Sequence, residues 1–278
     1  MNRIFRLFLA IILLIALTTP NCTTYAENEL LHIYFMDVGQ ADATIITCGD
    51  MALMIDGGNS GDSSLIYSML RNELGIEHID YMIATHPHED HVGGLSGALN
   101  ACSVDVLYTS VLEYDTKTFN SLMYYAQQQD TTILIPQPGD TFYIGSARVE
   151  ILAPIREYRN YNNMSIVAKI TYGDTRFLFT GDVEWDAEHD MVEAGIDLSA
   201  DVLKVAHHGS NSSSSYVFLR EVMPAYAIIS VGEGNSYGHP TEEVLSKLRD
   251  VGATVMRTDE RGTIECISDG NSITVLYD

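Results

Sequence analysis

The run Thr85-His86-Pro87-His88-Glu89-Asp90-His91 constrains this chain more than any other part of its sequence. Three histidines and Asp90 within six positions are more metal-binding side chains than packing requires. Neutral imidazole and carboxylate are ligands of borderline divalent ions such as zinc and manganese. The apolar segment 81–84 predicts a buried strand, and Gly93 to Asn100 predicts the start of a helix. We therefore expect a ligand-bearing turn at a strand's C-terminal end; the alternative is a polar surface turn.

Such a turn can serve two ions side by side. His86 and His88 can point to one ion, while Asp90 and His91 point to a second. Two neighbouring ions repel each other, so a carboxylate that bridges them is useful. Asp182 is the candidate bridge, because it follows an apolar strand and Gly181, which allows a sharp turn. The alternative is that Asp182 caps the helix that follows.

A pair of histidines, His207 and His208, follows another apolar strand. We expect at least one of them to complete the shell of the second ion, and we favour His207 because it is nearer the strand. The other would hold a phosphate oxygen or a ligating side chain. Adjacent residues of a strand point to opposite faces, so both cannot point the same way from it. The alternative for either one is a core histidine.

Substrate contacts are predicted in two loops. His239, between Gly238 and Pro240, could donate a proton to a leaving oxygen or stabilise developing charge. The alternative is a solvent-exposed histidine ahead of a helix. The serine-rich loop 210–215, beginning with Ser210, offers hydroxyl groups to phosphate oxygens, unless it is simply a flexible polar loop. Tyr237 is expected to bind substrate as well.

These motifs together resemble the metallo-β-lactamase fold superfamily. Their order resembles one branch of it, the soluble hydrolase domain of the DNA-uptake protein ComEC and its free-standing relatives. The resemblance implies an α/β fold, a four-layer αββα sandwich with the metal site at one edge between the sheets. It also implies that Asp56 orients the histidine turn from behind. Asp37 and Asp42 would lie near the metal edge, or serve as a cap or turn. The motifs lie at 35–43, 55–58, 85–95, 180–182, 207–210 and 236–240.

One departure concerns the first ion. Two-metal members of the superfamily carry a further histidine between the first turn and the bridging aspartate, but none occurs here between His91 and His189. The ComEC-like branch shares that absence. Asn163 or a water could fill the gap, unless Asn162-Asn163 is an ordinary turn. We expect two divalent ions, zinc or manganese, and an oxygen-richer shell favours manganese.

Hydrophobic periodicity and turn residues predict alternating strands and helices. The expected strands are 30–36, 43–48, 51–55, 81–84, 104–108, 141–144, 147–152, 166–172, 176–180, 202–206 and 226–231, followed by a C-terminal hairpin. The expected helices are 63–74, 119–129, 185–194, 216–223 and 242–251.

The first 26 residues are typical of a secretory signal peptide. Arg3 and Arg6 precede an apolar run at 7–17, and small residues precede a cut expected after Ala26. Residues 27–278 would then form one hydrolase domain. The apolar run is short for a membrane span, so we expect a secreted or cell-surface protein without a stable anchor. Cys22 raises a lipoprotein alternative, in a poor sequence context.

The formal net charge of −23 suits a secreted protein and works against broad attraction to phosphate backbones. The cysteines left after cleavage are Cys48, Cys102 and Cys266. Because they are odd in number and widely spaced, we expect buried thiols rather than a disulfide framework.

The function expected from these features is metal-dependent hydrolysis of a phosphodiester, with DNA as one candidate polymer. Paired ions lower the pKa of a bound water and screen the charge of a phosphodiester. Asp90 is expected to be a catalytic residue as well as a metal ligand. One alternative is a different bond: a cell-wall phosphoester such as phosphorylcholine, or a lactone or amide. Another is a non-catalytic module that binds nucleic acid during DNA uptake. The retained ligands argue against that module, since binding alone does not require them.

Overall fold

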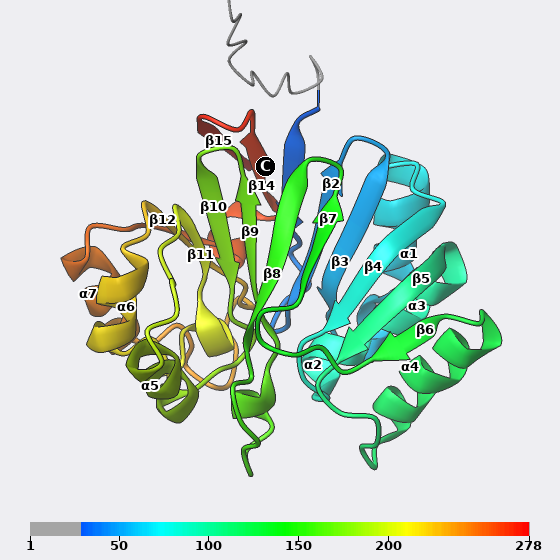
Figure 1. Cartoon of the computed structure of the whole chain (residues 1–278), viewed down its shortest axis with the longest axis horizontal. Coiled ribbons are helices and arrows are strands. Elements are labelled where there is room, and N and C mark those ends of the chain that lie inside the picture. Colours follow the sequence, from blue (N-terminus) through cyan, green and yellow to red (C-terminus); the bar gives the residue numbers. More distant parts are fainter. Residues whose placement is uncertain (1–28, 278) are drawn as a thin grey trace, which may run out of the picture.

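Two β-sheets pack face to face, and helices cover their outer faces (Figure 1). The computed structural model describes residues 29–277, so the expected signal peptide at 1–26 lies outside the described residues. The architecture is an αββα sandwich, which confirms the expected fold.

The first sheet has eight strands, and those from β3 to β6 run parallel. Helices α1 (Ser63–Ser68), α3 (Leu95–Ala101) and α4 (Lys117–Gln128) cover its outer face (Figure 1). In spatial order the strands are β15 (Ile273–Tyr277), β14 (Ile264–Ser268), β1 (Leu31–Phe35), β2 (Ala43–Cys48), β3 (Met51–Gly57), β4 (His78–Ala84), β5 (Ser103–Thr109) and β6 (Thr132–Leu134).

The second sheet has seven strands and is covered by α5 (Trp185–Glu193), α6 (Tyr216–Val222) and α7 (Glu242–Asp250). The short helix α8 (Thr258–Arg261) leads from this sheet back to the first. In spatial order the strands are β13 (Thr254–Arg257), β12 (Tyr226–Ile229), β11 (Val202–Lys204), β10 (Thr175–Phe179), β9 (Val167–Tyr172), β8 (Ala147–Ala153) and β7 (Thr141–Ile144).

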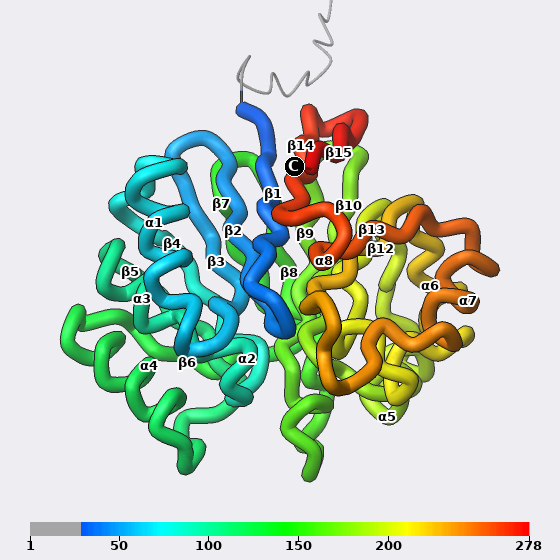
Figure 2. Tube along the Cα trace, turned by 180° about the vertical axis from the view of Figure 1, so that it is seen from behind, coloured from blue at the N-terminus to red at the C-terminus, as the bar shows by residue number. Residues whose placement is uncertain are grey.

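The main apolar core lies between the two sheets. Alternate residues of β1 point inward, as a half-buried strand requires, and Phe35 stacks on Phe179 of the opposite sheet with ring centroids 5.8 Å apart. The last two strands return to this sheet, where β14 pairs with β1 and β15 pairs with β14 (Figure 2). Segments from the start and the end of residues 29–277 therefore complete one sheet.

The expected elements agree with the observed ones to within a few residues, and the structure adds short elements to them. The structure adds the short strands β6 and β13 and the one-turn helix α2 (Glu89–Val92). The segment expected as one helix at 63–74 is α1 followed by a π-helical turn, Met69–Glu73. Cys48, Cys102 and Cys266 are buried free thiols, as expected.

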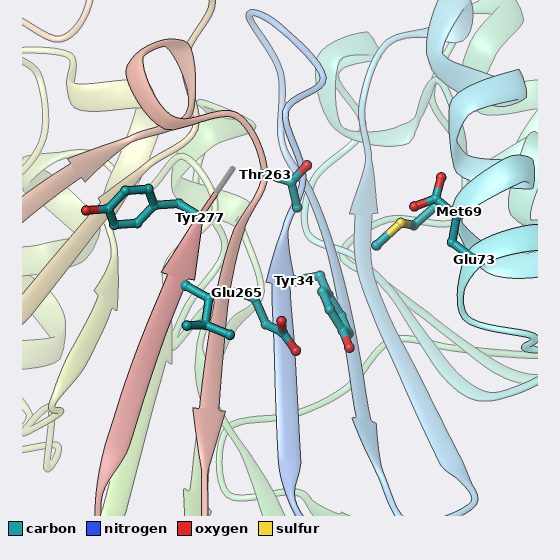
Figure 3. A pocket seen from close by; sticks show the side chains of 7 residues that line it. Tyr34, Met69, Glu73, Thr263, Glu265 and Tyr277 are labelled. Carbon is teal, nitrogen blue, oxygen red and sulfur yellow. The ribbon is translucent and has the colours of Figure 1, made fainter.

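The outer face of β1, β14 and β15 is partly exposed, beside the π-helical turn Met69–Glu73. A groove of about 260 Å³ lies there, lined in part by Tyr34, Thr263, Glu265 and Tyr277 (Figure 3). Burial and the Glu265 carboxylate raise the pKa of Tyr34 to about 12. The groove contains none of the candidate site residues. Within residues 29–277, no helix has the length and apolar character needed to cross a bilayer.

Candidate metal centre

Asp56 anchors the histidine turn from behind. It lies at the end of β3, and the parallel neighbour β4 ends at the same edge, so the turn that follows β4 passes directly over it. The Thr85 backbone N–H and hydroxyl donate to its two carboxylate oxygens at 2.8 and 2.7 Å. His91 donates through Nδ1 to Oδ2 at 2.8 Å. Asp56 thus lies where the resemblance placed it.

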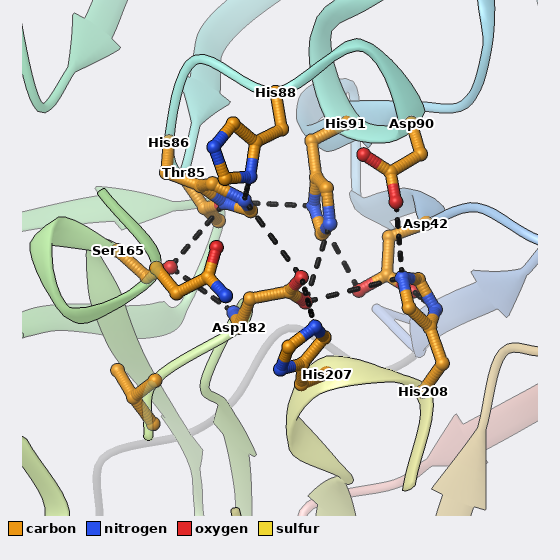
Figure 4. Close-up of polar contacts among 12 residues, drawn as sticks. Asp42, Thr85, His86, His88, Asp90, His91, Ser165, Asp182, His207 and His208 are labelled. Carbon is orange, nitrogen blue, oxygen red and sulfur yellow. Dashed lines mark hydrogen bonds and ion pairs between the residues drawn. The ribbon is translucent and has the colours of Figure 1, made fainter. Parts of the chain in front are cut away.

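The first half of the turn brings two imidazole nitrogens together. His86 Nε2 lies 3.0 Å from His88 Nδ1 (Figure 4). Two nitrogens bound to one tetrahedral zinc ion at 2.0–2.1 Å would lie roughly 3.3 Å apart. On the far side of the His86 ring, Nδ1 lies 3.2 Å from the Thr85 hydroxyl and 3.3 Å from that of Ser165. These contacts turn Nε2 toward the site.

The second half of the turn contributes to a separate group of ligands. Helix α2 begins at Glu89 and carries Asp90 and His91. The His91 ring packs beside His86, with ring centroids 4.1 Å apart. One ligand atom from each of Asp90, His91, Asp182 and His208 lies within 4.8 Å of the others. His91 Nε2 is 3.2 Å from Asp182 Oδ1, and His208 Nε2 is 3.4 Å from Asp90 Oδ2.

Asp182 lies between the two groups and presents one oxygen to each. Its Oδ1 faces His91, while its Oδ2 is 3.8 Å from His86 Nε2 (Figure 4). Gly181 has φ +50°, which lets the chain turn after β10, and the Ser165 hydroxyl accepts the Asp182 N–H at 3.0 Å. This is the position expected of a bridging carboxylate.

Both adjacent histidines face Asp182, contrary to the strand-based expectation. Strand β11 ends at Lys204, and His207 and His208 have φ +52° and +53°, so they lie in a left-handed turn. The alternation of side chains along a strand does not apply there. His207 Nε2 is 3.8 Å from Oδ2 of Asp182, and His208 Nε2 is 4.0 Å from Oδ1.

The preference for His207 in the second group was therefore wrong. His208 belongs with Asp90 and His91. His207 lies beside the same Asp182 oxygen as His86, where the first ion was expected to lack one imidazole. Asn163 is buried nearby, and its carbonyl oxygen accepts the Glu184 N–H at 2.8 Å.

A buried carboxylate and lysine hold His208 from behind, and sequence reasoning had not paired them. His208 donates through Nδ1 to the Ser230 carbonyl at 2.9 Å and lies 3.3 Å from Asp42 Oδ1. Lys204 donates to the other oxygen of Asp42 at 2.7 Å. A lysine in the otherwise apolar segment 202–205 was the available signal, since an unpaired charge is rarely buried.

The donor atoms fit a divalent metal. Within residues 29–277, His91 Nε2, His208 Nε2 and Asp182 Oδ1 are buried without a hydrogen-bond partner. Leaving such atoms unsatisfied is costly, and all three converge on one point. Because the Nδ1 atoms are engaged behind both rings, each Nε2 presents its lone pair once the imidazole is neutral. A cation at this point would satisfy every one of these atoms.

Electrostatics point the same way. Burial opposes the charged form of His91, but Asp182 and Asp56 raise its pKa well above the usual range. Burial likewise opposes charge on His208, yet Asp42 and Asp182 raise its pKa to about 10. Burial would raise the pKa of Asp90, but the close contact with His208 and the charge of His91 lower it to about 2. The carboxylates therefore require positive charge, which a divalent ion supplies in place of the protons.

His86 behaves differently. Burial and the neighbouring charge of His91 lower its pKa well below the usual range, so the ring is neutral near pH 7. A neutral imidazole is the form that binds a metal.

The predicted substrate residues lie at the rim. The His239 ring is 5.8 Å from His207, and its Nδ1 is buried without a partner among residues 29–277. Tyr237 stacks on His239 with centroids 5.7 Å apart and is 70% exposed. Ser210 is buried and bonds to the Ser212 hydroxyl, and it is Ser212 that lies 3.2 Å from His207 Nδ1.

The serine-rich loop is fixed rather than free, since the Glu188 carboxylate accepts the N–H groups of Ser214 and Ser215 at 2.5 and 2.8 Å. Asp37 is exposed and accepts the Gly39 N–H at 3.1 Å, which is the turn role that had been left open for it.

Known proteins share this sequence pattern. Residues 36–233 match the family model described as the Metallo-beta-lactamase superfamily. ComE operon protein 3 of Bacillus subtilis (strain 168) is 32% identical over 192 residues, covering 69% of this chain and 25% of that protein. Competence protein ComA of Neisseria gonorrhoeae is 28% identical over 260 residues, covering 92% of this chain and 35% of that protein. The chain thus spans about a quarter to a third of the length of these relatives.

A solved structure shares the fold. The metallo-beta-lactamase fold protein YhfI from Bacillus subtilis superposes with a TM-score of 0.56 at 14% identity, covering 87% of this chain and 100% of that one. Together with the two competence proteins, it confirms the resemblance drawn from the motifs.

Proposed function

The chain belongs to the metallo-β-lactamase superfamily, and from that premise we propose that it is an exported metal-dependent phosphodiesterase acting on DNA or another phosphodiester polymer. It is a superfamily hydrolase with a candidate multi-residue metal site. The observation that carries the proposal is Asp182, which turns one oxygen toward His86 and the other toward His91.

Each residue has a place in this proposal. Divalent ions, zinc or manganese, would lower the pKa of a water and screen the negative charge of a phosphodiester. The ligands divide into two sets that share Asp182: His86, His88 and His207 on one side, and Asp90, His91 and His208 on the other.

His239, at the rim, would serve the leaving oxygen. Burial and the nearby His207 lower its pKa, so it titrates below the usual value for histidine. In its protonated form it can give a proton to the leaving group, and in its neutral form it can donate a hydrogen bond there.

Hydrolysis of bis-p-nitrophenyl phosphate, single-stranded DNA, double-stranded DNA and choline-phosphate esters tests this function. With manganese or zinc, we expect cleavage of the first compound and of at least one DNA substrate, loss of activity in EDTA, and recovery when metal returns. A metal-loaded chain that cleaves only the choline esters would overturn the proposal.

Variants of the ligands sharpen the test. The double variant His86→Ala/His88→Ala should abolish activity with the fold largely intact, because both residues lie on a turn at the sheet edge. Asp182→Asn should reduce both metal occupancy and rate. Asp186→Asn, on the exposed side of α5, is the matched control and should change neither.

Export is the second part of the proposal and rests on the sequence of residues 1–26. N-terminal sequencing of secreted material should begin close to Glu27. Finding the intact leader on a cytoplasmic protein would contradict export and leave the phosphodiesterase proposal to its own test.

A further inference from the structure

Aromatic side chains flank the candidate metal centre on two sides. On one side the Tyr114 ring lies 6.2 Å from His88, and Tyr161 packs edge-on against Tyr114 with centroids 4.9 Å apart. On the other side Tyr237 stacks on His239, which lies beside His207. His88 and His207 are candidate ligands, so a phosphodiester at the centre would have an aromatic ring on either side of it.

The first pair comes from two loops that meet at the metal edge. Tyr114 follows the carboxyl end of β5, and Tyr161 precedes the short turn Asn162–Met164. Both loops project beyond the ends of the strands near α2, in the lower part of Figure 1. A hollow of about 580 Å³ opens beside Tyr161, which is 38% exposed. It is lined by Val111, Glu157, Tyr158, Arg159, Tyr161 and Met164. Aromatic surface is therefore accessible next to the ligands.

The charge around these rings selects what they can bind. Glu113, Asp115 and Glu157 lie on the same two loops, and Arg159 is a basic residue that lines the hollow. Together with the net charge of −23, they disfavour a run of phosphates. Carboxylates do, however, accept hydrogen bonds from the exocyclic amino groups of nucleobases, and a tyrosine ring offers a face for stacking. The site suits a base better than a backbone.

We propose that Tyr114 and Tyr161 form a stacking site for a base of a single-stranded nucleic acid, on one side of the scissile phosphodiester, and that Tyr237 receives a base on the other side. The inference rests on the proposed phosphodiesterase function and narrows its substrate. A single strand is required, because the faces of bases in a duplex are already covered by their neighbours. Stacking is tolerant of sequence, so any base can occupy the site.

The test compares short DNA strands that carry bases with strands of the same length made of abasic residues. Binding to the metal-loaded chain is followed by fluorescence anisotropy, using methylphosphonate linkages that resist hydrolysis and carry no charge. Cleavage of the matching phosphodiester strands is measured as kcat/KM. We expect about 10-fold or greater preference for the base-bearing strand in both measurements, the size expected for stacking of one base or more.

Variants locate the effect. Tyr161→Leu should cut the preference at least about 5-fold, while Tyr161→Phe, which keeps the ring, should retain it. Tyr143→Leu is the matched control, because Tyr143 is a 55% exposed tyrosine on β7, away from the metal centre. The turn at Gly145 that follows it contacts Met51, which lies at the opposite end of β3 from Asp56. Circular dichroism and Tm establish that each variant is folded.

Equal binding of base-bearing and abasic strands by the wild-type chain would overturn the inference, and so would an equal loss in Tyr161→Leu and Tyr143→Leu. Either result leaves the phosphodiesterase proposal standing if bis-p-nitrophenyl phosphate is still hydrolysed. Conversely, base-dependent binding that Tyr161→Leu abolishes would support the stacking site even if no cleavage occurred, in which case the phosphodiesterase proposal alone fails.

Discussion

His91 donates through Nδ1 to Asp56 across 2.8 Å, which directs its other ring nitrogen, Nε2, at the second group of ligands. Removing the charge of Asp56 should therefore weaken metal binding without removing any ligand. We predict that Asp56→Asn lowers affinity for manganese by about 10- to 100-fold, the usual effect of losing a partner behind a ligating histidine. Calorimetric titration measures it. The exposed Asp37→Asn variant is the control, and an unchanged affinity in Asp56→Asn would refute the positioning role.

The two adjacent histidines should govern different ions. Since His208 lies with Asp90 and His91, and His207 lies beside the Asp182 oxygen that faces His86, each single alanine variant should retain one tightly held ion. Native mass spectrometry under limiting manganese should show one ion per chain for His207→Ala and for His208→Ala, and less for the double variant. His189→Ala, on the exposed surface of α5, serves as the control. Two tightly bound ions in His207→Ala would show that His207 is no ligand.

His239 should affect turnover and spare the metal. His239→Ala is predicted to keep the wild-type metal content while lowering kcat by roughly 10²–10⁴-fold, as expected for a lost general acid or base. Substrates with p-nitrophenol as leaving group should be partly rescued, because that group needs little protonation. Paired measurements with p-nitrophenyl and alkyl esters distinguish the cases. Loss of metal, or an equal loss for all leaving groups, would assign His239 to binding or positioning instead.

The metal-free chain should lose stability as pH rises from 6.5 to about 8.5. The folded state raises the pKa of His208 from its usual 6.5 to about 10, with Asp42 and Asp182 outweighing burial, and it raises that of His91 as well. A group whose pKa is raised on folding stabilises the protein fully below its unfolded pKa, and this contribution fades as pH approaches the folded value. Each imidazole can change the free energy of unfolding by up to about 1.4 kcal/mol per pH unit.

Urea unfolding in EDTA and in manganese measures this effect. Manganese should stabilise the chain by an amount that grows with pH, because binding displaces protons from these histidines. The pH range of this test ends near 8.5, because above it the buried thiols of Cys48, Cys102 and Cys266, whose pKa values are raised, also change the free energy of unfolding. A metal-free stability that rises over this range would be inconsistent with cationic His91 and His208.

Local patterns in the sequence account for most of the fold. Alternating apolar residues in β1, and the turn residues around Gly145 and Gly173, are local signals that survive in the folded chain. Strands β6 and β13 were missed because they are short and lie at or near the sheet edges, where packing imposes little pattern. The helical turn α2 was missed because it is only four residues long and polar residues, including the candidate ligands Asp90 and His91, give it no apolar periodicity.

The parts of the candidate site that a local sequence motif marks could be predicted. The parts that depend on backbone conformation or on contacts between distant segments could not. The turn 86–91 and Asp182 could be assigned from the sequence. The roles of His207 and His208 could not, because they depend on two left-handed residues that no strand pattern predicts. Tyr114 and Tyr161 lie far apart in the sequence and meet only at the metal edge.

The central claim is that paired ligand groups sharing Asp182 make this chain a metal-dependent phosphodiesterase. The most direct measurement is the initial rate of cleavage of labelled single-stranded DNA as a function of manganese concentration, with bound metal counted on the same samples. The account predicts no cleavage in EDTA and a rate that rises with occupancy and saturates when both groups are filled. A chain that holds two manganese ions and cleaves neither DNA nor bis-p-nitrophenyl phosphate at any concentration would contradict it.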